Sequence, residues 1–282
     1  MTVGFEFNKA YVIESLGKER KTGQELYDDL LRWQAFQLNN FEASLYQPIT
    51  KQDFFDVIEE IKLDAISNGK YPILHIEMHG KADKSGMVFT SHESITWIEL
   101  YDILVDLNIV VNNNLFLTLG VCMGGYLMQI AKPLRPSPFW GFIGSFEILF
   151  NTDILIRYNE FYTVLLASLD INKAFDALKT VNTGIPADYR FINTETLFQR
   201  IYQKYSESQF SQQAIKSRFD EALKSEKINI KDKNQKNKFF IKFQSELARS
   251  KKEFFEKHKR TFFMVDLYPD NSSKFLKDWS PF

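Results

Sequence analysis

The sequence contains a single cysteine, which excludes a disulfide within the chain. It has no apolar run of about 18 residues, the length that a membrane-spanning helix needs. Its first residues show no basic stretch followed by an apolar one, so we expect no secretion signal. Internal repeats and low-complexity tracts are also missing. Together these absences predict a protein of the reducing cytoplasm.

The composition allows a sizeable core and hides an uneven charge. Hydrophobic residues make up 44% of the 282 residues, and 27 of these are phenylalanine. The net charge is only −1, yet residues 216–260 hold 15 Lys/Arg against 7 Asp/Glu, a local charge of +8. We therefore expect one large domain followed by a distinct, basic C-terminal region.

Apolar segments of strand length alternate with helical ones over the first 180 residues or so. We expect strands over residues 9–16, 41–46, 71–78, 115–121 and 139–146, and helices over residues 24–36, 51–67, 95–107, 125–131, 152–169 and 172–180. Thr50 and Ser94 have the residue type and position of helix N-caps. Strands that are separated by helices pair in parallel, so the pattern predicts an α/β fold with a mainly parallel central sheet.

The alternation ends near residue 188. Long helical patterns follow over residues 194–227 and 237–260, with an exposed polar connection over 228–238 and a late strand over 261–267. We predict a domain over residues 1–190 and a helical, basic accessory region over 191–282.

Two short motifs close two successive strands of the predicted sheet. Met78-His79-Gly80 ends one, and Cys122 follows the other inside a glycine-rich turn, 43 residues after His79. In parallel sheets the ligand site lies at the carboxyl ends of the strands, so both side chains are expected there. A helix that starts just after Cys122 and a nearby imidazole would favour the reactive thiolate. A buried structural cysteine is the alternative interpretation.

The order of the two residues discriminates between classes of cysteine enzyme. The α/β-hydrolase elbow with cysteine and the class-I glutamine amidotransferase elbow both take their histidine from after the nucleophile. The only downstream histidine is His258, which lies in a Lys/Arg-rich segment that we expect to be a charged surface helix. Only a site that takes its histidine from the preceding strand fits this chain.

Residues 73–80 and 117–125 resemble the caspase-like (clan CD) cysteine peptidases, including the bacterial caspase–CHAT group. Residues 141–145 and Phe161-Tyr162 add weaker similarity, and the whole resemblance covers about residues 9–180. It implies a caspase-like three-layer sandwich with a mainly parallel sheet.

The resemblance also implies roles for individual residues. His79 would act as the base, Cys122 as the nucleophile, and the amides of Gly80 and Cys122 as the oxyanion hole. Because the Gln-Ala-Cys signature of animal caspases is absent, their preference for aspartate does not transfer.

Charged residues near the predicted site suggest two opposite substrate pockets. Glu147 and Asp153 follow the fifth predicted strand and could select a basic side chain, although Asp153 equally suits the first turn of a helix. Arg135 and Arg157 are the candidates for an acidic substrate.

We expect neither a metal nor a cofactor. On a strand, His75 and His79 would lie roughly 13 Å apart, at about 3.3 Å per residue, too far for one zinc ion. His75 is therefore expected to be a packed, hydrogen-bonded residue.

The resulting hypothesis is a regulated, bacterial, cytoplasmic cysteine endopeptidase that cleaves a protein or peptide substrate. By analogy with the family we expect an activating partner or small signal molecule, a role in antiphage defence, and no membrane contact. The alternatives are an inactive caspase-like scaffold, or a protein that binds nucleic acid or another partner through residues 216–260. The phenylalanines of that region are expected to pack against the peptidase domain: Phe239, Phe240, Phe243, Phe254 and Phe255.

Overall fold

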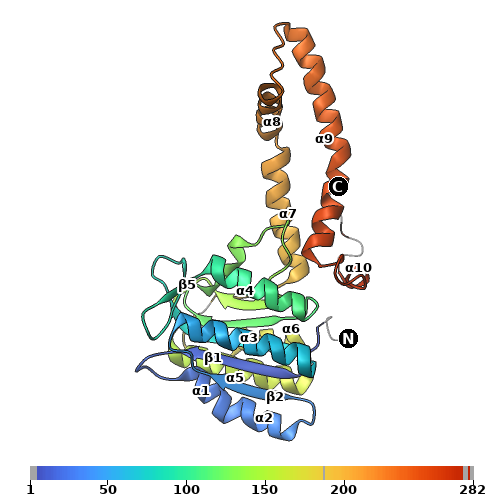
Figure 1. Ribbon diagram of the computed structural model, residues 1–282. Helices are drawn as coiled ribbons and strands as arrows, with labels where there is room; N and C mark the ends of the chain where they lie inside the picture. The colour runs from blue at the N-terminus through green and yellow to red at the C-terminus, as the bar shows by residue number, and fades with distance from the viewer. Residues whose placement is uncertain (1–4, 187, 276–278, 280–282) are drawn as a thin grey trace. The chain divides into compact units, whose positions relative to one another are not determined.

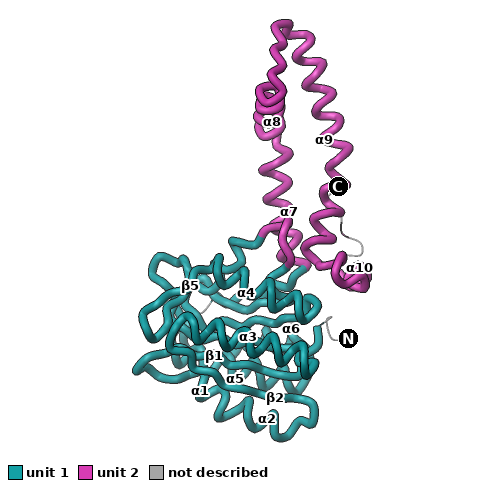
Figure 2. Tube along the Cα trace, in the orientation of Figure 1, with its two compact units in different colours: residues 1–131, 137–194 teal, residues 132–136, 195–282 magenta. Residues whose placement is uncertain are grey.

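The computed structural model describes the whole chain except residues 1–4, 187, 276–278 and 280–282. The chain divides into two compact units (Figure 2). Residues 1–131 and 137–194 form the first, and residues 132–136 and 195–282 the second. The second unit therefore takes one short segment from within the first.

The first unit is built on a mixed, mostly parallel sheet (Figure 1). Its strands are β1 (Lys9–Ser15), β2 (Glu42–Tyr46), β3 (Pro72–Gly80), β4 (Gly86–Val88), β5 (Ser94–Thr96), β6 (Phe116–Val121), β7 (Gly141–Ser145) and β8 (Tyr189–Asn193). The main order is β2-β1-β3-β6-β7-β8, in which only β8 is antiparallel to its neighbour. β4 and β5 extend the end of β3 as an antiparallel hairpin. The predicted α/β fold with a mainly parallel sheet is confirmed.

Helices cover both faces of this sheet. They are α1 (Thr22–Leu26), η1 (Tyr27–Leu31), α2 (Arg32–Gln37), α3 (Lys51–Asn68), α4 (Trp97–Val110), η2 (Gly124–Ile130), α5 (Asn151–Ser168) and α6 (Ile171–Thr180). α3 and α4 lie on one face, and α1, α2 and α5 lie on the other (Figure 1). α6 packs on α5. The first unit therefore has three layers, with the sheet in the middle.

Local sequence signals account for the starts of α3 and α4. Thr50 begins α3 with a capping box, in which its hydroxyl accepts from the amide of Asp53 while the Asp53 carboxylate accepts from the amide of Thr50. Thr96 makes the same arrangement with Glu99 at the start of α4. The prediction of Thr50 is confirmed, but that of Ser94 is wrong, because Ser94 pairs in β5 and leaves the cap to Thr96.

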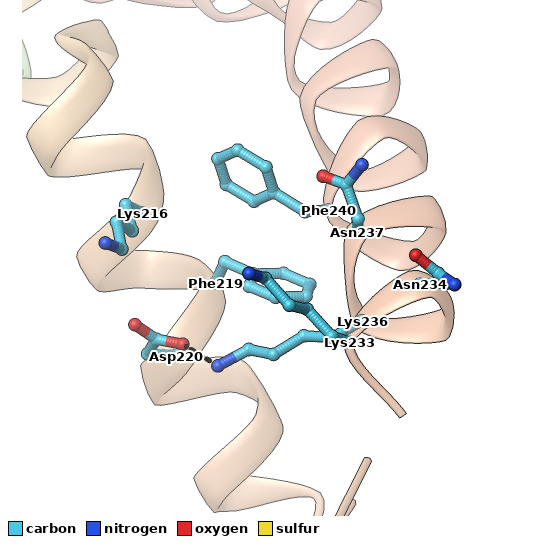
Figure 3. A pocket seen from close by; sticks show the side chains of 8 residues that line it. All are labelled: Lys216, Phe219, Asp220, Lys233, Asn234, Lys236, Asn237 and Phe240. Carbon is cyan, nitrogen blue, oxygen red and sulfur yellow. Dashed lines mark hydrogen bonds and ion pairs between the residues drawn. The ribbon is translucent and has the colours of Figure 1, made fainter. Parts of the chain in front are cut away.

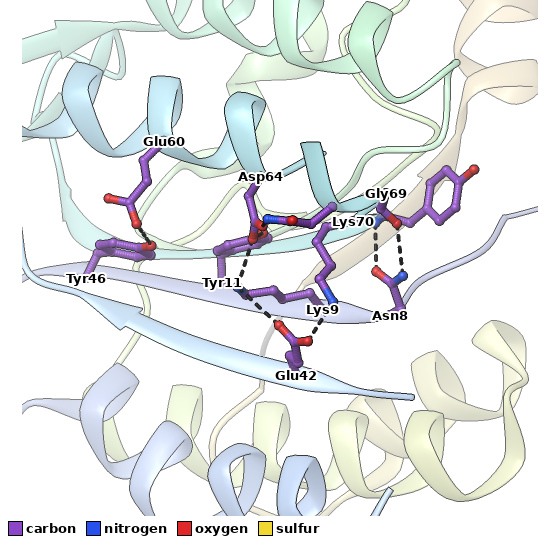
Figure 4. Close-up of polar contacts among 11 residues, drawn as sticks. Asn8, Lys9, Tyr11, Glu42, Tyr46, Glu60, Asp64, Gly69 and Lys70 are labelled. Carbon is purple, nitrogen blue, oxygen red and sulfur yellow. Dashed lines mark hydrogen bonds and ion pairs between the residues drawn. The ribbon is translucent and has the colours of Figure 1, made fainter. Parts of the chain in front are cut away.

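A polar cluster joins β1 to α3 on one face of the sheet (Figure 4). Lys9 Nζ lies 2.8 Å from Asp64 Oδ2 and 3.4 Å from Glu42 Oε2. Tyr11 also donates to Asp64, and Asn68 donates to its other oxygen at 2.6 Å. Burial raises the pKa of Asp64, but the bonds from Lys9, Tyr11 and Asn68 outweigh it and lower that pKa to about 2.

This lowered pKa predicts a pH-dependent contribution to stability. Because the folded pKa of Asp64 lies below its usual value of 3.8, the contribution is present above pH 4 and is lost as the pH falls towards 2. We expect Asp64→Asn to lower the free energy of unfolding at pH 6 by about 1–2 kcal/mol, and by much less at pH 2.5. Urea unfolding at both pH values measures the difference. An equal loss at both would contradict the assignment.

The second unit is helical. It contains α7 (Thr194–Phe210, all but its first residue), α8 (Gln212–Ser225), α9 (Lys233–Phe262) and α10 (Asn271–Lys274). The predicted late strand over 261–267 is wrong, because these residues end α9 and continue as turns, with Met264 at a φ of 57°. The predicted polar connection is shorter than expected, since α9 already begins at Lys233.

Aromatic contacts within the second unit join α7 and α8 to α9. The Phe219 ring lies 5.2 Å from that of Phe240 and 5.5 Å from that of Phe243. Phe255 packs against Phe198 and Tyr202 of α7. Phe240, Phe243 and Phe255 therefore have partners inside their own unit, and Phe239 and Phe254 are exposed. The prediction was that all five pack against the first domain.

None of the helices in the described part of the chain combines the length and the apolar character that spanning a membrane requires.

Candidate active site

The register of two neighbouring strands places His79 beside Cys122. β3 and β6 pair in parallel, and the last matched residues are Met78 and Val121. His79 is the next residue of β3, and Cys122 is the next residue after β6. Adjacent strands lie about 4.8 Å apart, so the two residues are neighbours at the carboxyl edge of the sheet.

Regular alternation would also take their side chains out of the sheet on the same face. Side chains alternate along a strand, and matched residues of paired strands point to the same side. His75, four residues before His79, is matched to Thr118, and its Nδ1 lies 2.7 Å from the Thr118 hydroxyl. Continued alternation would put His79 and Cys122 on this face, which α1 and α5 cover.

A carboxylate from a different strand end holds the imidazole. Glu19 lies in the loop between β1 and α1, and its Oε2 is 2.7 Å from His79 Nε2. Both side chains are about half exposed, at 51% and 52%. With Nε2 bound to Glu19, Nδ1 is the nitrogen that would exchange a proton with a thiol. Our sequence analysis missed Glu19; the strand order, which puts β1 next to β3, is the signal that reveals it.

The loop after β7 contacts the thiol. The backbone amide of Leu149 lies 3.3 Å from Cys122 Sγ, and the backbone amide of Met123 donates to the Glu147 carbonyl at 3.1 Å. Met123 has a φ of 61°, which turns the chain sharply into η2. Cys122 itself is half-buried. A thiolate would thus have one backbone donor in place.

The backbone of Gly80 lies directly against Cys122. A Cβ atom added to Gly80 would lie 2.0 Å from the Cys122 carbonyl oxygen, so no other residue fits without moving the strand ends apart. This contact brings the two residues of the expected oxyanion hole together.

Replacing this glycine should therefore disturb the site. We expect Gly80→Ala to lower the free energy of unfolding by about 1–3 kcal/mol and to change the rate at which iodoacetamide alkylates Cys122. Chemical denaturation and intact mass spectrometry measure the two effects. Gly17→Ala is the matched control for the stability measurement, because a Cβ added there meets no atom within 4 Å. Wild-type stability and reactivity in Gly80→Ala would contradict the contact.

A buried chain of hydrogen bonds runs beneath the site. Tyr162 lies 2.9 Å from Thr118, Thr118 contacts His75, and His75 Nε2 lies 2.8 Å from Glu77 Oε1. Thr22 donates to Glu77 Oε2. The prediction that His75 is a packed, hydrogen-bonded residue is confirmed.

The candidate pocket residues differ in exposure. Glu147 is exposed, and its backbone touches the turn after Cys122. Asp153 is only 1% exposed, and its Oδ1 accepts from Arg157 Nε at 2.6 Å. Asp153 Oδ2 has no partner among the described residues. None of these contacts tests a role of Asp153 in binding substrate, and that role stays a prediction.

The two arginines considered for an acidic substrate lie in different units. Arg157 is itself buried, and it also donates to the carbonyls of Leu178 and Ile185. It therefore ties α5 to the segment after α6. Arg135 belongs to the second unit.

The only histidine after Cys122 in the sequence, His258, does not lie on the surface. His258 is 2% exposed and packs against Tyr202 and Tyr205, so the expected surface position is wrong. Burial, with a smaller effect of Lys257, lowers the pKa of His258. Within the described residues, no three His, Cys, Asp or Glu side chains are grouped so as to hold a metal ion.

The basic C-terminal region contains a pocket of about 510 Å³ between α8 and α9 (Figure 3). Its lining includes Lys216, Lys233 and Lys236, together with the rings of Phe219 and Phe240. Lys236 pairs with Asp220 at 2.9 Å. The rings contact each other inside the hairpin, so stacking on nucleic-acid bases would require them to separate.

Comparison with known proteins adds no assignment: no family model matches the chain, and no curated protein matches it significantly.

Proposed function

We propose that this protein is a cytoplasmic cysteine endopeptidase of the caspase-like type, with His79 and Cys122 as its catalytic residues. One observation carries the proposal: His79 and Cys122 directly follow the last matched pair of two adjacent parallel strands. The contact between Glu19 and the far nitrogen of His79 supports it, because a base works best when a third group orients it.

The reaction would proceed by acyl transfer. His79 Nδ1 takes the proton of the Cys122 thiol, and the thiolate forms a bond to the carbonyl carbon of the scissile peptide. The amides of Gly80 and Cys122 would stabilise the resulting oxyanion. His79 then gives its proton to the departing amine as the C–N bond breaks. Water, deprotonated by His79, finally hydrolyses the thioester and restores the thiol.

Glu147 is the better candidate for substrate selection. Its carboxylate is exposed, while its backbone lies against the catalytic turn, so it could pair with a basic side chain of the substrate. We therefore propose cleavage after a basic residue. By analogy with the caspase–CHAT group, an activator would control the enzyme, and antiphage defence would be its setting.

Covalent labelling tests the proposal. Peptidyl chloromethyl ketones with Lys, Arg, Asp or Leu at the terminal position should label the single cysteine, with the basic peptides fastest. We expect His79→Ala to reduce the labelling rate at least 100-fold, since general base catalysis contributes about 10²–10⁴. Intact mass spectrometry reads the adduct, and Glu147→Gln should remove the preference for basic peptides.

His92→Ala is the matched control, because His92 is an exposed histidine outside the site. Equal labelling of wild type and His79→Ala would contradict the dyad and favour the inactive scaffold. Equal labelling of the wild-type protein by basic, acidic and apolar peptide ketones would contradict the role of Glu147 in substrate selection.

A further inference from the structure

We propose that Glu14 and Glu77, two buried carboxylates on neighbouring strands, position Glu19, and through it His79, by clamping the first turn of α1. The inference rests on the proposed function of His79, and it assigns positioning roles to residues that touch no substrate.

The two carboxylates form a matched pair in the sheet. Glu14 of β1 is in register with Glu77 of β3, so both side chains point to the α1 face. Neither side chain has more than 1% of its surface exposed. Two carboxylates buried side by side repel each other and lose their hydration, so they need several donors to be tolerated. These donors come largely from one place, the first turn of α1.

Glu14 holds the backbone of that turn. Its Oε1 accepts from the amides of Gly23 at 2.9 Å and Gln24 at 3.2 Å, and its Oε2 accepts from the Gln47 side chain at 2.9 Å. A Cβ added to Gly23 would lie only 3.2 Å from Val12 and 3.3 Å from the Glu14 carboxylate. The glycine allows the helix start to approach the strand this closely.

Glu77 holds the side chain of the same turn. Thr22 donates to its Oε2, and His75 Nε2 contacts its Oε1. The carboxylate can only accept, so His75 donates to it from Nε2; Nδ1 of the same ring contacts Thr118, and Thr118 contacts Tyr162. These contacts fix the geometry at the Thr22 anchor.

The segment that carries Glu19 is therefore pinned at both ends. β1 ends at Ser15, whose hydroxyl donates to the Pro48 carbonyl at 2.6 Å, and the α1 anchor begins at Thr22. Only residues 16–21 bridge the two, and Glu19 lies in their middle. Since the Glu19 side chain is half exposed, burial does little to hold it, and the short span between the anchors limits where it can lie.

Releasing the clamp should act on Cys122 through Glu19. Thr22→Val keeps the shape of the side chain but removes the hydroxyl that Glu77 accepts from. The segment 16–21 would then spend less time with Glu19 at His79. If Thr22→Val acts through Glu19, it should have no further effect in the Glu19→Gln background, because glutamine cannot accept a full charge-assisted hydrogen bond from His79.

A double-mutant cycle tests this path. The readout is the rate at which iodoacetamide alkylates Cys122, the only cysteine, which follows the thiolate and needs no peptide substrate. We expect Glu19→Gln and Thr22→Val each to slow alkylation several-fold, and the double variant to match Glu19→Gln alone. Thr22→Ser, which keeps the hydroxyl, should restore the wild-type rate.

Hydrogen exchange provides the structural readout. Thr22→Val should raise deuterium uptake over residues 16–21 and leave the β3 strand unchanged. Should Thr22→Val fail to fold, Glu14→Gln takes its place in the same cycle, because it weakens the other half of the clamp and keeps one acceptor oxygen.

Multiplicative effects in the cycle would overturn the proposal, because they would show that Thr22 acts independently of Glu19. Unchanged exchange over 16–21, or an unchanged alkylation rate in Glu19→Gln, would overturn it as well. Neither readout depends on peptide cleavage. The two proposals can therefore fail separately. If both readouts support the clamp but no peptide ketone labels Cys122, the peptidase assignment fails and this inference stands.

Discussion

The candidate site depends on the parallel register between β3 and β6. Six matched pairs, from Ile73 with Phe116 to Met78 with Val121, fix the position of one strand relative to the other. A shift of one residue would turn either His79 or Cys122 to the opposite face, because side chains alternate along a strand. Burial of both strands on both faces sets this register, so the packing of the core determines the geometry of the site.

The layer beneath the site is unusually polar for a core. Glu14, His75, Glu77, Thr118 and Thr22 are all buried between the sheet and α1 or α5, and each has a hydrogen-bond partner. An apolar layer of the same shape would stabilise the fold at least as well, since buried ionic groups seldom add net stability. A polar layer does fix directions, because hydrogen bonds are directional and apolar contacts are not. This preference for direction over stability is what a preorganised site requires.

Much of the first unit could be predicted from its sequence. The apolar runs that became β3 and β6 are long and have a glycine within three residues of their predicted ends, so their type was clear. β8 was missed because it is a short antiparallel strand at the sheet edge, and its pattern resembles the helices that follow it. The strand predicted over 261–267 was wrong because most of its apolar residues are buried in turns at the end of α9. A buried turn and a strand can have the same apolar sequence pattern.

The site could be predicted only in part. His79, Gly80 and Cys122 follow from the ends of two strands that are successive in the predicted strand order. Glu19 could not be found in this way, because its contact with His79 depends on β1 lying next to β3, which strand order alone decides. The same holds for Leu149, whose backbone reaches Cys122 from the loop after β7. Contacts of this kind require the sheet order, and a linear pattern does not contain it.

Cleavage of peptide bonds is the central claim, and a peptide library tests it most directly. A proteome-derived library would be incubated with the wild-type protein and with Cys122→Ala, and new amino termini identified by mass spectrometry. We expect wild-type protein alone to create termini, and these to share a basic residue before the cut. Identical termini in both samples, under conditions in which a peptide ketone labels Cys122, would contradict an endopeptidase function.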